Sequence, residues 1–192
     1  MPEPLAPAED AARMERTNAV HEALLAQWRK AMDLVGPGPL APHFIDAAGA
    51  VRGLPAAGRW VDLGSGAGFP GVALAGLFPG LAVELVESRQ KRATFLEKVV
   101  RDAGLSNARA ICCRSEELSP GAYDGLISRA YKPPEAVLAE DGARLLRPGG
   151  LAVLLLGDGG PMVAPPGWER TEELRYAVPD GHRRRVVLRR VG

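Results

Sequence analysis

The sequence has few cysteines, few aromatic residues (5%) and no long apolar run. No apolar segment approaches the roughly 20 residues that a membrane-spanning helix needs. The N-terminal stretch MPEPLAPAED lacks the basic start and apolar core of a secretory signal. The cysteines, Cys112 and Cys113, are adjacent, and this spacing fits no common zinc site. We therefore expect a cytoplasmic protein with reduced thiols, without a bound metal or a membrane partner.

Length and composition indicate a globular chain of modest net charge. With 192 residues, the chain suggests one domain or one domain with a short appendage. Hydrophobic residues make up 46% of it, which is enough for a sizeable core, and the net charge of +1 gives no global argument for nucleic acid. A local basic cluster, HRRRVVLRR, lies near the C-terminus. It is either the solvated rim of a terminal strand or a surface that faces RNA.

The N-terminal part has the periodicity of helices. Apolar residues at helical spacing predict a long amphipathic helix over about 11–35, which the segment GPGP ends. The stretch PHFIDAAGAV predicts a second, shorter helix. These helices form a predicted appendage over residues 1–58, and a main domain follows over residues 59–192.

From Arg59 onwards, apolar strands alternate with helical segments. The predicted strands are RWVDL, LAVELVE, NARAICC, YDGLISRA and LAVLLL. Apolar strands separated by helices imply a parallel sheet covered on both faces. Near the C-terminus, TEELRYAV and RRRVVLRRV predict an antiparallel hairpin around the turn PDG. The expected fold class is α/β, a Rossmann-like, mostly parallel sheet with a C-terminal hairpin, preceded by helices.

A glycine-rich turn, VDLGSGAGFPG, follows the first predicted strand. Gly64, Gly66 and Gly68 lack a Cβ, so the chain turns tightly and a ligand can touch the backbone at the carboxyl end of the sheet. The letters GAGFPG also match the dinucleotide pattern G-x-G-x-x-G. However, Asp62 would repel a pyrophosphate, and Pro70 occupies the start of the helix that would point N–H groups at it. Both features favour S-adenosylmethionine over NAD.

Other polar residues stand at the predicted strand ends. Asp62 either orients the loop or meets the cationic amino end of the methionine moiety. Glu87 ends the second strand, where a carboxylate can accept both ribose hydroxyls or be an ordinary surface acid. Ser115 and Glu116 either flank an adenine or are solvated. Arg129 leaves the fourth strand on the ligand side, where it contacts a substrate phosphate or the cofactor carboxylate, or makes a simple ion pair.

Several motifs together resemble one family. WRKAMDLVG, HFIDA, VDLGSGAGFPG, VESRQKRATFLEKVV, CRSEEL, YDGLISRA and LLRPGG occur in the order typical of the glucose-inhibited-division protein B (RsmG) family. The resemblance covers about residues 28–150. It implies a class I methyltransferase fold and methyl transfer from S-adenosylmethionine to N7 of a guanine in the decoding region of 16S rRNA. Guanine N7 has a free lone pair and no proton to lose, so this reaction needs alignment rather than a general base.

The resemblance also implies roles for individual residues. Carried over by position, the cofactor contacts are Gly64, Phe69, Glu87, Ser115, Glu116 and Arg129. Together with Asp62 and the loop residues Ser65, Gly66 and Gly68, they make up the predicted cofactor site. Arg129 is also the predicted positioning residue for catalysis, and Lys91, Arg92 and Arg114 are the predicted RNA contacts.

The chain departs from the family pattern at several positions. Leu156 stands where the family has a lysine at the end of strand five, and the Gly/Pro-rich stretch GDGGPMVAPPGW replaces the following helix. Asp33 replaces an asparagine, and SRAYK in place of SRAVA introduces Tyr131 and Lys132. We hypothesise that Lys132 supplies the missing charge. The alternatives are a methyltransferase with a changed acceptor and a ribosome-associated module that binds S-adenosylmethionine without transferring methyl. The expected oligomeric state is a monomer.

Overall fold

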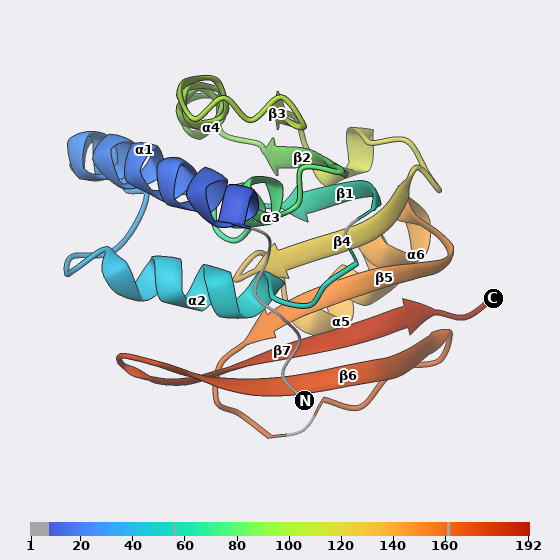
Figure 1. Ribbon diagram of the computed structural model, residues 1–192. Coiled ribbons are helices and arrows are strands. Elements are labelled where there is room, and N and C mark those ends of the chain that lie inside the picture. Colours follow the sequence, from blue (N-terminus) through green and yellow to red (C-terminus); the bar gives the residue numbers. More distant parts are fainter. Residues whose placement is uncertain (1–7, 56, 161) are drawn as a thin grey trace.

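A single mixed sheet organises the described part of the chain. The structure is a computed structural model that describes residues 8–55, 57–160 and 162–192. Its sheet has seven strands in the order β3-β2-β1-β4-β5-β7-β6 (Figure 1). The neighbours among the first five strands are parallel, and β7 runs antiparallel to both β5 and β6. The expected fold class is confirmed. The strands are β1 (Gly58–Leu63), β2 (Leu81–Glu87), β3 (Ala108–Cys112), β4 (Tyr123–Arg129), β5 (Leu146–Leu156), β6 (Trp168–Val178) and β7 (Gly181–Arg190).

Helices cover both faces of the sheet. One face carries α1 (Ala8–Met32), α2 (Ala41–Val51), α3 (Gly71–Leu77) and α4 (Gln90–Asp102). The other face carries the short η1 (Ser115–Glu117) and a continuous helical segment made of α5 (Pro134–Ala136), the π-helical η2 (Val137–Gly142) and α6 (Ala143–Leu145). The predicted alternation of strands and helical segments therefore also holds between β4 and β5, where the helical segment has a wider turn in its middle.

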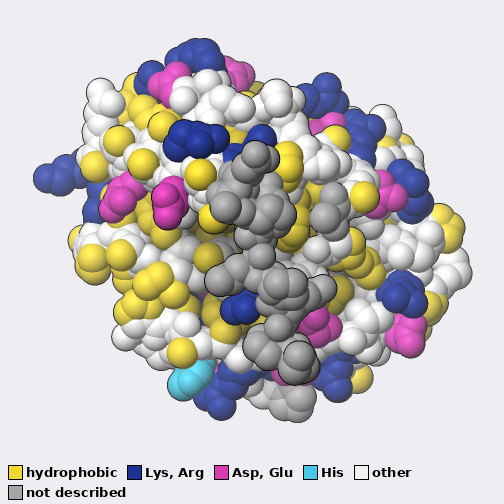
Figure 2. All heavy atoms as spheres, in the orientation of Figure 1, with side chains coloured by type: hydrophobic (Ala, Val, Ile, Leu, Met, Phe, Trp, Pro, Cys, Tyr) yellow, Lys and Arg dark blue, Asp and Glu magenta, His cyan; other side chains and the backbone are white. Residues whose placement is uncertain are grey.

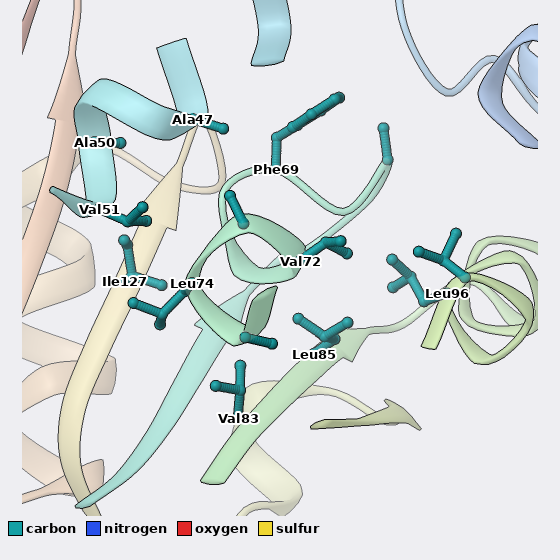
Figure 3. Close-up of a cluster of buried hydrophobic side chains, with 14 of the residues drawn as sticks. Ala47, Ala50, Val51, Phe69, Val72, Leu74, Val83, Leu85, Leu96 and Ile127 are labelled. Atoms are coloured by element: carbon teal, nitrogen blue, oxygen red, sulfur yellow. The ribbon is translucent and has the colours of Figure 1, made fainter. Parts of the chain in front are cut away.

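The core consists of two apolar layers, one on each side of the sheet. In β5, Val153 and Leu155 belong to one layer, whereas Ala152 and Leu154 belong to the other, because successive side chains of a strand point to opposite faces. Apolar residues on both faces explain why this strand reads as an unbroken apolar run. On the first face, side chains from α2, α3, α4, β2 and β4 meet in one cluster (Figure 3).

The N-terminal helices pack into the same core as the strands. Arg13 on α1 donates to the carbonyl oxygens of Gly76 at 3.1 Å and Ala75 at 3.2 Å, and to Asn107 Oδ1 at 2.6 Å. Leu25 of α1 and Val51 of α2 are completely buried in the cluster that also holds the side chains of β2 and β4. The boundary at residue 58 stays a prediction. No helix in the described ranges has the length and apolar character needed to cross a membrane.

The basic cluster near the C-terminus is largely paired within the hairpin. Arg184 and Arg185 on β7 lie 2.9 Å from Glu173 and 2.5 Å from Glu172 of β6. They are only 7% and 2% exposed. Neither of the two interpretations that the sequence leaves open describes Arg184 and Arg185, because they are buried in cross-strand ion pairs rather than solvated or presented to RNA. On the visible face of the molecule, Lys and Arg side chains occur at separate places rather than in one patch (Figure 2).

Candidate functional site

A pocket of about 450 Å³ lies at the carboxyl edge of the sheet, where β1, β2, β3 and β4 end. This is the edge at which parallel α/β sheets bind their ligands, and the volume suits a small molecule. The pocket brings together many of the residues predicted from sequence: Gly64, Glu87, Arg92, Arg114, Ser115, Glu116 and Lys132.

The glycine loop requires its glycines for conformational and steric reasons. Gly64, Gly66 and Gly68 have φ values of +68°, +51° and +94°, a region that L side chains rarely adopt. A Cβ on Gly64 would lie 2.5 Å from Tyr131 Cδ2, and a Cβ on Gly68 would lie 2.8 Å from Val72 Cγ2. By contrast, the nearest heavy atom to a Cβ on Gly66 is 3.6 Å away. A Cβ on Gly66 would therefore make only ordinary van der Waals contacts, among them one with Glu87 Oε2 at 3.9 Å.

Glu87 connects the glycine loop to the start of α4. One carboxylate oxygen accepts a hydrogen bond from the N–H of Gly66 at 3.2 Å, and the other accepts from the N–H of Arg89 at 2.9 Å. An ionised carboxylate has about four acceptor sites, so this leaves capacity for ligand hydroxyls. Glu87 is thus a fixed acceptor at the end of β2, as its position in the sequence predicts.

Asp62 and Ser65 are buried, and their side chains hydrogen-bond to the backbone at the two ends of the glycine loop. Asp62 is 1% exposed, and its Oδ2 accepts from the N–H of Gly71 at 3.1 Å at the start of α3. Its Oδ1 has no hydrogen-bond partner among the described residues, and burial raises the pKa of this carboxyl to about 7. Ser65 Oγ donates to the carbonyl oxygen of Asp62 at 2.8 Å. These contacts fit the loop-orienting role of Asp62, and its contact with a ligand stays a prediction.

Arg129 is held by partners from two distant elements. Its Nη1 lies 3.0 Å from Asp46 Oδ2 on α2, and the hydroxyl of Tyr176 on β6 donates to Asp46 Oδ1 at 2.7 Å. The guanidinium carbon lies 5.1 Å from the centroid of the Phe69 ring, within the range of a cation–π contact. Sequence reasoning missed Asp46 as a partner, although it lies in the quoted motif HFIDA.

Phe69 and the backbone of the glycine loop are fixed by histidines of the N-terminal helices. Phe69 is 4% exposed, and its ring centroid lies 4.7 Å from His21 and 5.6 Å from His43. His21 Nε2 donates to the carbonyl oxygen of Ala67 at 2.7 Å. Burial lowers the pKa of His21 to about 4, so this ring stays neutral at pH 7. No sequence pattern links His21 to the loop.

Lys132 lies at the pocket, but its charge is already balanced. Its Nζ lies 3.0 Å from Glu140 Oε2 and 3.0 Å from Asp141 Oδ2, and a third acid, Glu116, is 3.9 Å away. Asp141 is 2% exposed, so Lys132 neutralises a buried carboxylate. To serve a substrate, Lys132 would have to leave these partners. Its catalytic role stays a prediction.

The predicted RNA contacts occupy different positions around the pocket. Lys91 and Arg114 are exposed, whereas Arg92 is half-buried and donates from Nη2 to the carbonyl oxygen of Asp33 at 2.6 Å. Arg92 Nε is buried without a partner in the described part of the chain. Arg89, which sequence reasoning did not select, also lines the pocket. Cationic side chains therefore surround this pocket, and their contact with RNA stays a prediction.

Leu156, at the position of the missing lysine, has a cation beside it on the neighbouring strand. In the ladder between β5 and β7, Leu156 is paired with Arg184. Arg184 Nε donates to the carbonyl oxygen of Gly157 at 3.1 Å, while the same guanidinium pairs with Glu173. Cys112 and Cys113 are free thiols, and no cluster of three or more His, Cys, Asp or Glu within the described ranges could hold a metal.

Comparison with known sequences finds one family, under the same description in each match. A family model described as rRNA small subunit methyltransferase G (GidB) matches residues 18–160. A protein of Xanthomonas oryzae pv. oryzae named ribosomal RNA small subunit methyltransferase G is 37% identical over 178 residues, which cover 88% of this chain and 83% of the relative. A protein of the same name from Novosphingobium aromaticivorans is 33% identical, with 89% and 78% covered.

Solved structures share the fold at low sequence identity. TYW2 of P. horikoshii, in complex with MeSAdo, has a TM-score of 0.60 at 14% identity, covering 81% of this chain and 64% of that one. The 1,6-didemethyltoxoflavin-N1-methyltransferase of Burkholderia thailandensis, with S-adenosylhomocysteine bound, has a TM-score of 0.58 at 17% identity, covering 100% and 94%. The order of the strands and the C-terminal hairpin are those of a class I methyltransferase.

Proposed function

This chain belongs to the rRNA small subunit methyltransferase G family, and we propose that it methylates N7 of a guanine in 16S ribosomal RNA. It is an S-adenosylmethionine-dependent rRNA methyltransferase of the class I fold. The choice of N7 rests on the resemblance of the sequence motifs. The observation that supports the site is a single pocket that joins Gly64, Glu87 and Ser115 from three different strand ends.

The residues of this pocket fit S-adenosylmethionine. When bound, this cofactor supplies a methyl group activated on a sulfonium. Glu87 offers its remaining acceptor sites to the ribose hydroxyls, and the absence of a side chain at Gly66 lets a ligand approach the backbone beside Glu87. Ser115 and Glu116 line the pocket beyond Glu87, where the base is expected. A pyrophosphate fits poorly, because Asp62 and Glu87 both place carboxylates against the loop.

The chain contributes positioning rather than proton transfer. Guanine N7 attacks through its lone pair and loses no proton, so the rate depends on in-line alignment of the nucleophile, the methyl carbon and the sulfur. Arg129 is fixed by Asp46 and by the ring of Phe69, so it presents a pre-oriented cation at the carboxyl edge. We assign Arg129 to the positioning of cofactor or target. Phe69 is part of the support beneath it.

We assign the binding of RNA to basic side chains at and around the pocket. Lys91, Arg92 and Arg114 would contact phosphates, which gives affinity that falls as salt is raised. Replacing the exposed Lys91 or Arg114 by Ala should weaken binding to small subunits and reduce its salt dependence. Cofactor affinity measured without RNA should not change in the Lys91 variant, because Lys91 lies outside the set of pocket-lining residues.

The decisive experiment measures cofactor binding and methyl transfer separately. S-adenosylmethionine is titrated calorimetrically into the protein, and transfer is assayed on small subunits that lack the mark, with the product base identified by digestion and mass spectrometry. Binding together with 7-methylguanine supports the proposal. Binding with methylation of another atom or of another RNA contradicts the proposed acceptor. An absence of binding contradicts the pocket assignment itself.

A changed acceptor is the second candidate, and two observations favour it. Leu156 is apolar, and the charge of Lys132 is balanced by acids, so neither residue supplies an unpaired cation at this edge. A ribosome-associated module that binds cofactor without transfer would share these features, and the same assay separates it by the absence of product. The monomeric state and the cytoplasmic location stay predictions, which light scattering and cell fractionation would check.

A further inference from the structure

Tyr131 lies between two sides of the pocket. Its ring is so close to Gly64 that a Cβ there would lie 2.5 Å from Cδ2. Its hydroxyl lies 3.0 Å from Ser115 Oγ, which follows β3. One side chain from the end of β4 therefore contacts both the glycine loop and the residue expected near the base.

The backbone on either side of Tyr131 is fixed. Arg129, two residues before it, is paired with Asp46, and Lys132, the next residue, is paired with Glu140 and Asp141. Ala130 has a φ of +53°, a left-handed conformation that is uncommon for a residue with a Cβ. Strain of this kind persists only where the surroundings determine the conformation. The ring of Tyr131 is therefore a pre-oriented wall of the pocket.

The direction of the hydrogen bond between Tyr131 and Ser115 follows from the acidity of the two hydroxyls. A phenol is a stronger acid than an aliphatic alcohol, so Tyr131 donates and Ser115 Oγ accepts. Ser115 is 3% exposed and lines the pocket. Among the described residues its own hydroxyl proton meets no acceptor, so this proton is free to be donated to a ligand.

We propose that Tyr131 is a positioning residue of the cofactor pocket: by donating to Ser115 Oγ, it turns the Ser115 hydroxyl proton towards a hydrogen-bond acceptor of the adenosyl group. This inference rests on the proposed function, because it takes the pocket to be the cofactor site. It adds a residue that acts through Ser115 rather than by direct contact. The departure of the motif SRAYK from SRAVA then has a role in binding.

The test is a double-mutant cycle in binding, without turnover. Dissociation constants for S-adenosylhomocysteine are measured by calorimetry for the wild type, Tyr131→Phe, Ser115→Ala and the double variant. Tyr131→Phe keeps the ring and removes only the hydroxyl. Each single variant should bind about 3- to 10-fold more weakly, the effect of one hydrogen bond. The double variant should bind no more weakly than Ser115→Ala, because the two hydroxyls act as one unit.

A matched control separates this effect from a general loss of stability. Tyr123→Phe likewise removes one phenolic hydroxyl, which donates to Glu84 Oε2 at 2.5 Å and lies outside the pocket. It should lower the melting temperature and leave the affinity unchanged. Unchanged binding by Tyr131→Phe, or additive losses in the double variant, would overturn the inference. If the wild-type protein does not bind S-adenosylhomocysteine, the pocket assignment fails instead, and the two failures are distinct.

Discussion

Asp46 on α2 and Arg129 on β4 form an ion pair of 3.0 Å that ties the N-terminal helices to the ligand edge of the sheet. The other carboxylate oxygen of Asp46 is occupied by the hydroxyl of Tyr176. The position of the guanidinium therefore depends on a helix and on a hairpin that lie far apart in the sequence. This dependence can be measured.

Asp46→Asn should weaken cofactor binding by about 5- to 10-fold, because an amide oxygen replaces one end of a charge-assisted pair and Arg129 loses its fixed position. Calorimetric titration of S-adenosylhomocysteine provides the measurement. Asp180→Asn is the control, since it removes an exposed ion pair with Arg183 of 2.8 Å in the hairpin turn. Equal affinities of the Asp46 and Asp180 variants would contradict a positioning role for Asp46.

Gly64→Ala should abolish detectable cofactor binding. The added methyl group would meet the ring of Tyr131 and would also require a left-handed backbone at φ +68°. Gly66→Ala should lower the free energy of unfolding by about 1–2 kcal/mol, the cost of a left-handed backbone for a residue with a Cβ. It adds no steric clash, because the heavy atom nearest to the new carbon is 3.6 Å away. Urea unfolding of both variants should therefore show the greater loss of stability for Gly64→Ala. The reverse order would exclude Tyr131 as the steric neighbour that matters.

Ala130→Gly should stabilise the protein by about 0.5–1 kcal/mol. Relief of the left-handed conformation at φ +53° gains roughly 1–2 kcal/mol, and the entropy of a new glycine costs roughly 0.5–1 kcal/mol. Ala103→Gly is the matched control, because Ala103 at the end of α4 has an unstrained φ of −81° and should lose stability. If both variants lose stability equally in urea unfolding, Ala130 is not strained.

His21 should make the stability of the protein depend on pH. Burial holds its folded-state pKa at about 4, below the value of 6.5 expected in the unfolded chain. As the pH falls, the unfolded state binds the proton before the folded state does. The contribution of His21 to the free energy of unfolding is therefore fully present above pH 6.5 and is lost as the pH falls towards 4. Its size is roughly 3 kcal/mol, from 1.36 kcal/mol for each pH unit between the two pKa values.

Urea unfolding at roughly pH 7.5, 5.5 and 4.5 provides the measurement for His21, with one condition above its expected transition and two within it. His21→Gln should remove most of the decline in stability between pH 6.5 and 4, even if it lowers stability at every pH. His182→Gln, at an exposed position in the hairpin, should keep the slope of the wild type. An unchanged slope in His21→Gln would assign the decline to other groups, among them His43, whose pKa burial also lowers.

Lys132→Ala tests the catalytic hypothesis against a structural role. Loss of the ammonium leaves the buried carboxylate of Asp141 without its cation, so we expect a destabilisation of about 1–3 kcal/mol. Lys98→Ala breaks an exposed pair with Asp102 and should cost well under 1 kcal/mol. Methyl transfer is then assayed at a temperature well below the melting temperatures of the Lys132→Ala and Lys98→Ala variants. An unchanged rate in Lys132→Ala would exclude the catalytic role and leave the structural one.

The order of the elements could be predicted because its causes are local. The strands of the parallel sheet are apolar on both faces, and glycines or prolines separate the segments, so periodicity and composition suffice to predict them. The prediction was less accurate where tertiary pairing decides the outcome. Strand β5 begins at Leu146 rather than at 151, because Leu146 pairs with Tyr123 of β4.

The hydrogen-bonding residues that line the pocket could be predicted from the sequence, whereas the residues that hold them in place could not. Glu87 ends β2 and Ser115 follows β3, so their places at the carboxyl edge of the sheet result from the topology. The partners Asp46, Tyr176 and His21 reach this edge from separate helices and from the hairpin, through side-chain contacts that no spacing rule contains. The same applies to Arg184 and Arg185 in the basic run on β7, which are paired with acids on the adjacent strand.

The hydrogen bond between Tyr176 and Asp46 joins residues 130 positions apart, and this separation has a consequence for biosynthesis. A chain that grows from its N-terminus contains Asp46 long before the hairpin that carries Tyr176 has been translated. Contacts of such range form late, after the local helices and the first parallel strands. The nascent enzyme therefore acquires the complete support of its ligand edge only after the hairpin that carries Tyr176 has been translated.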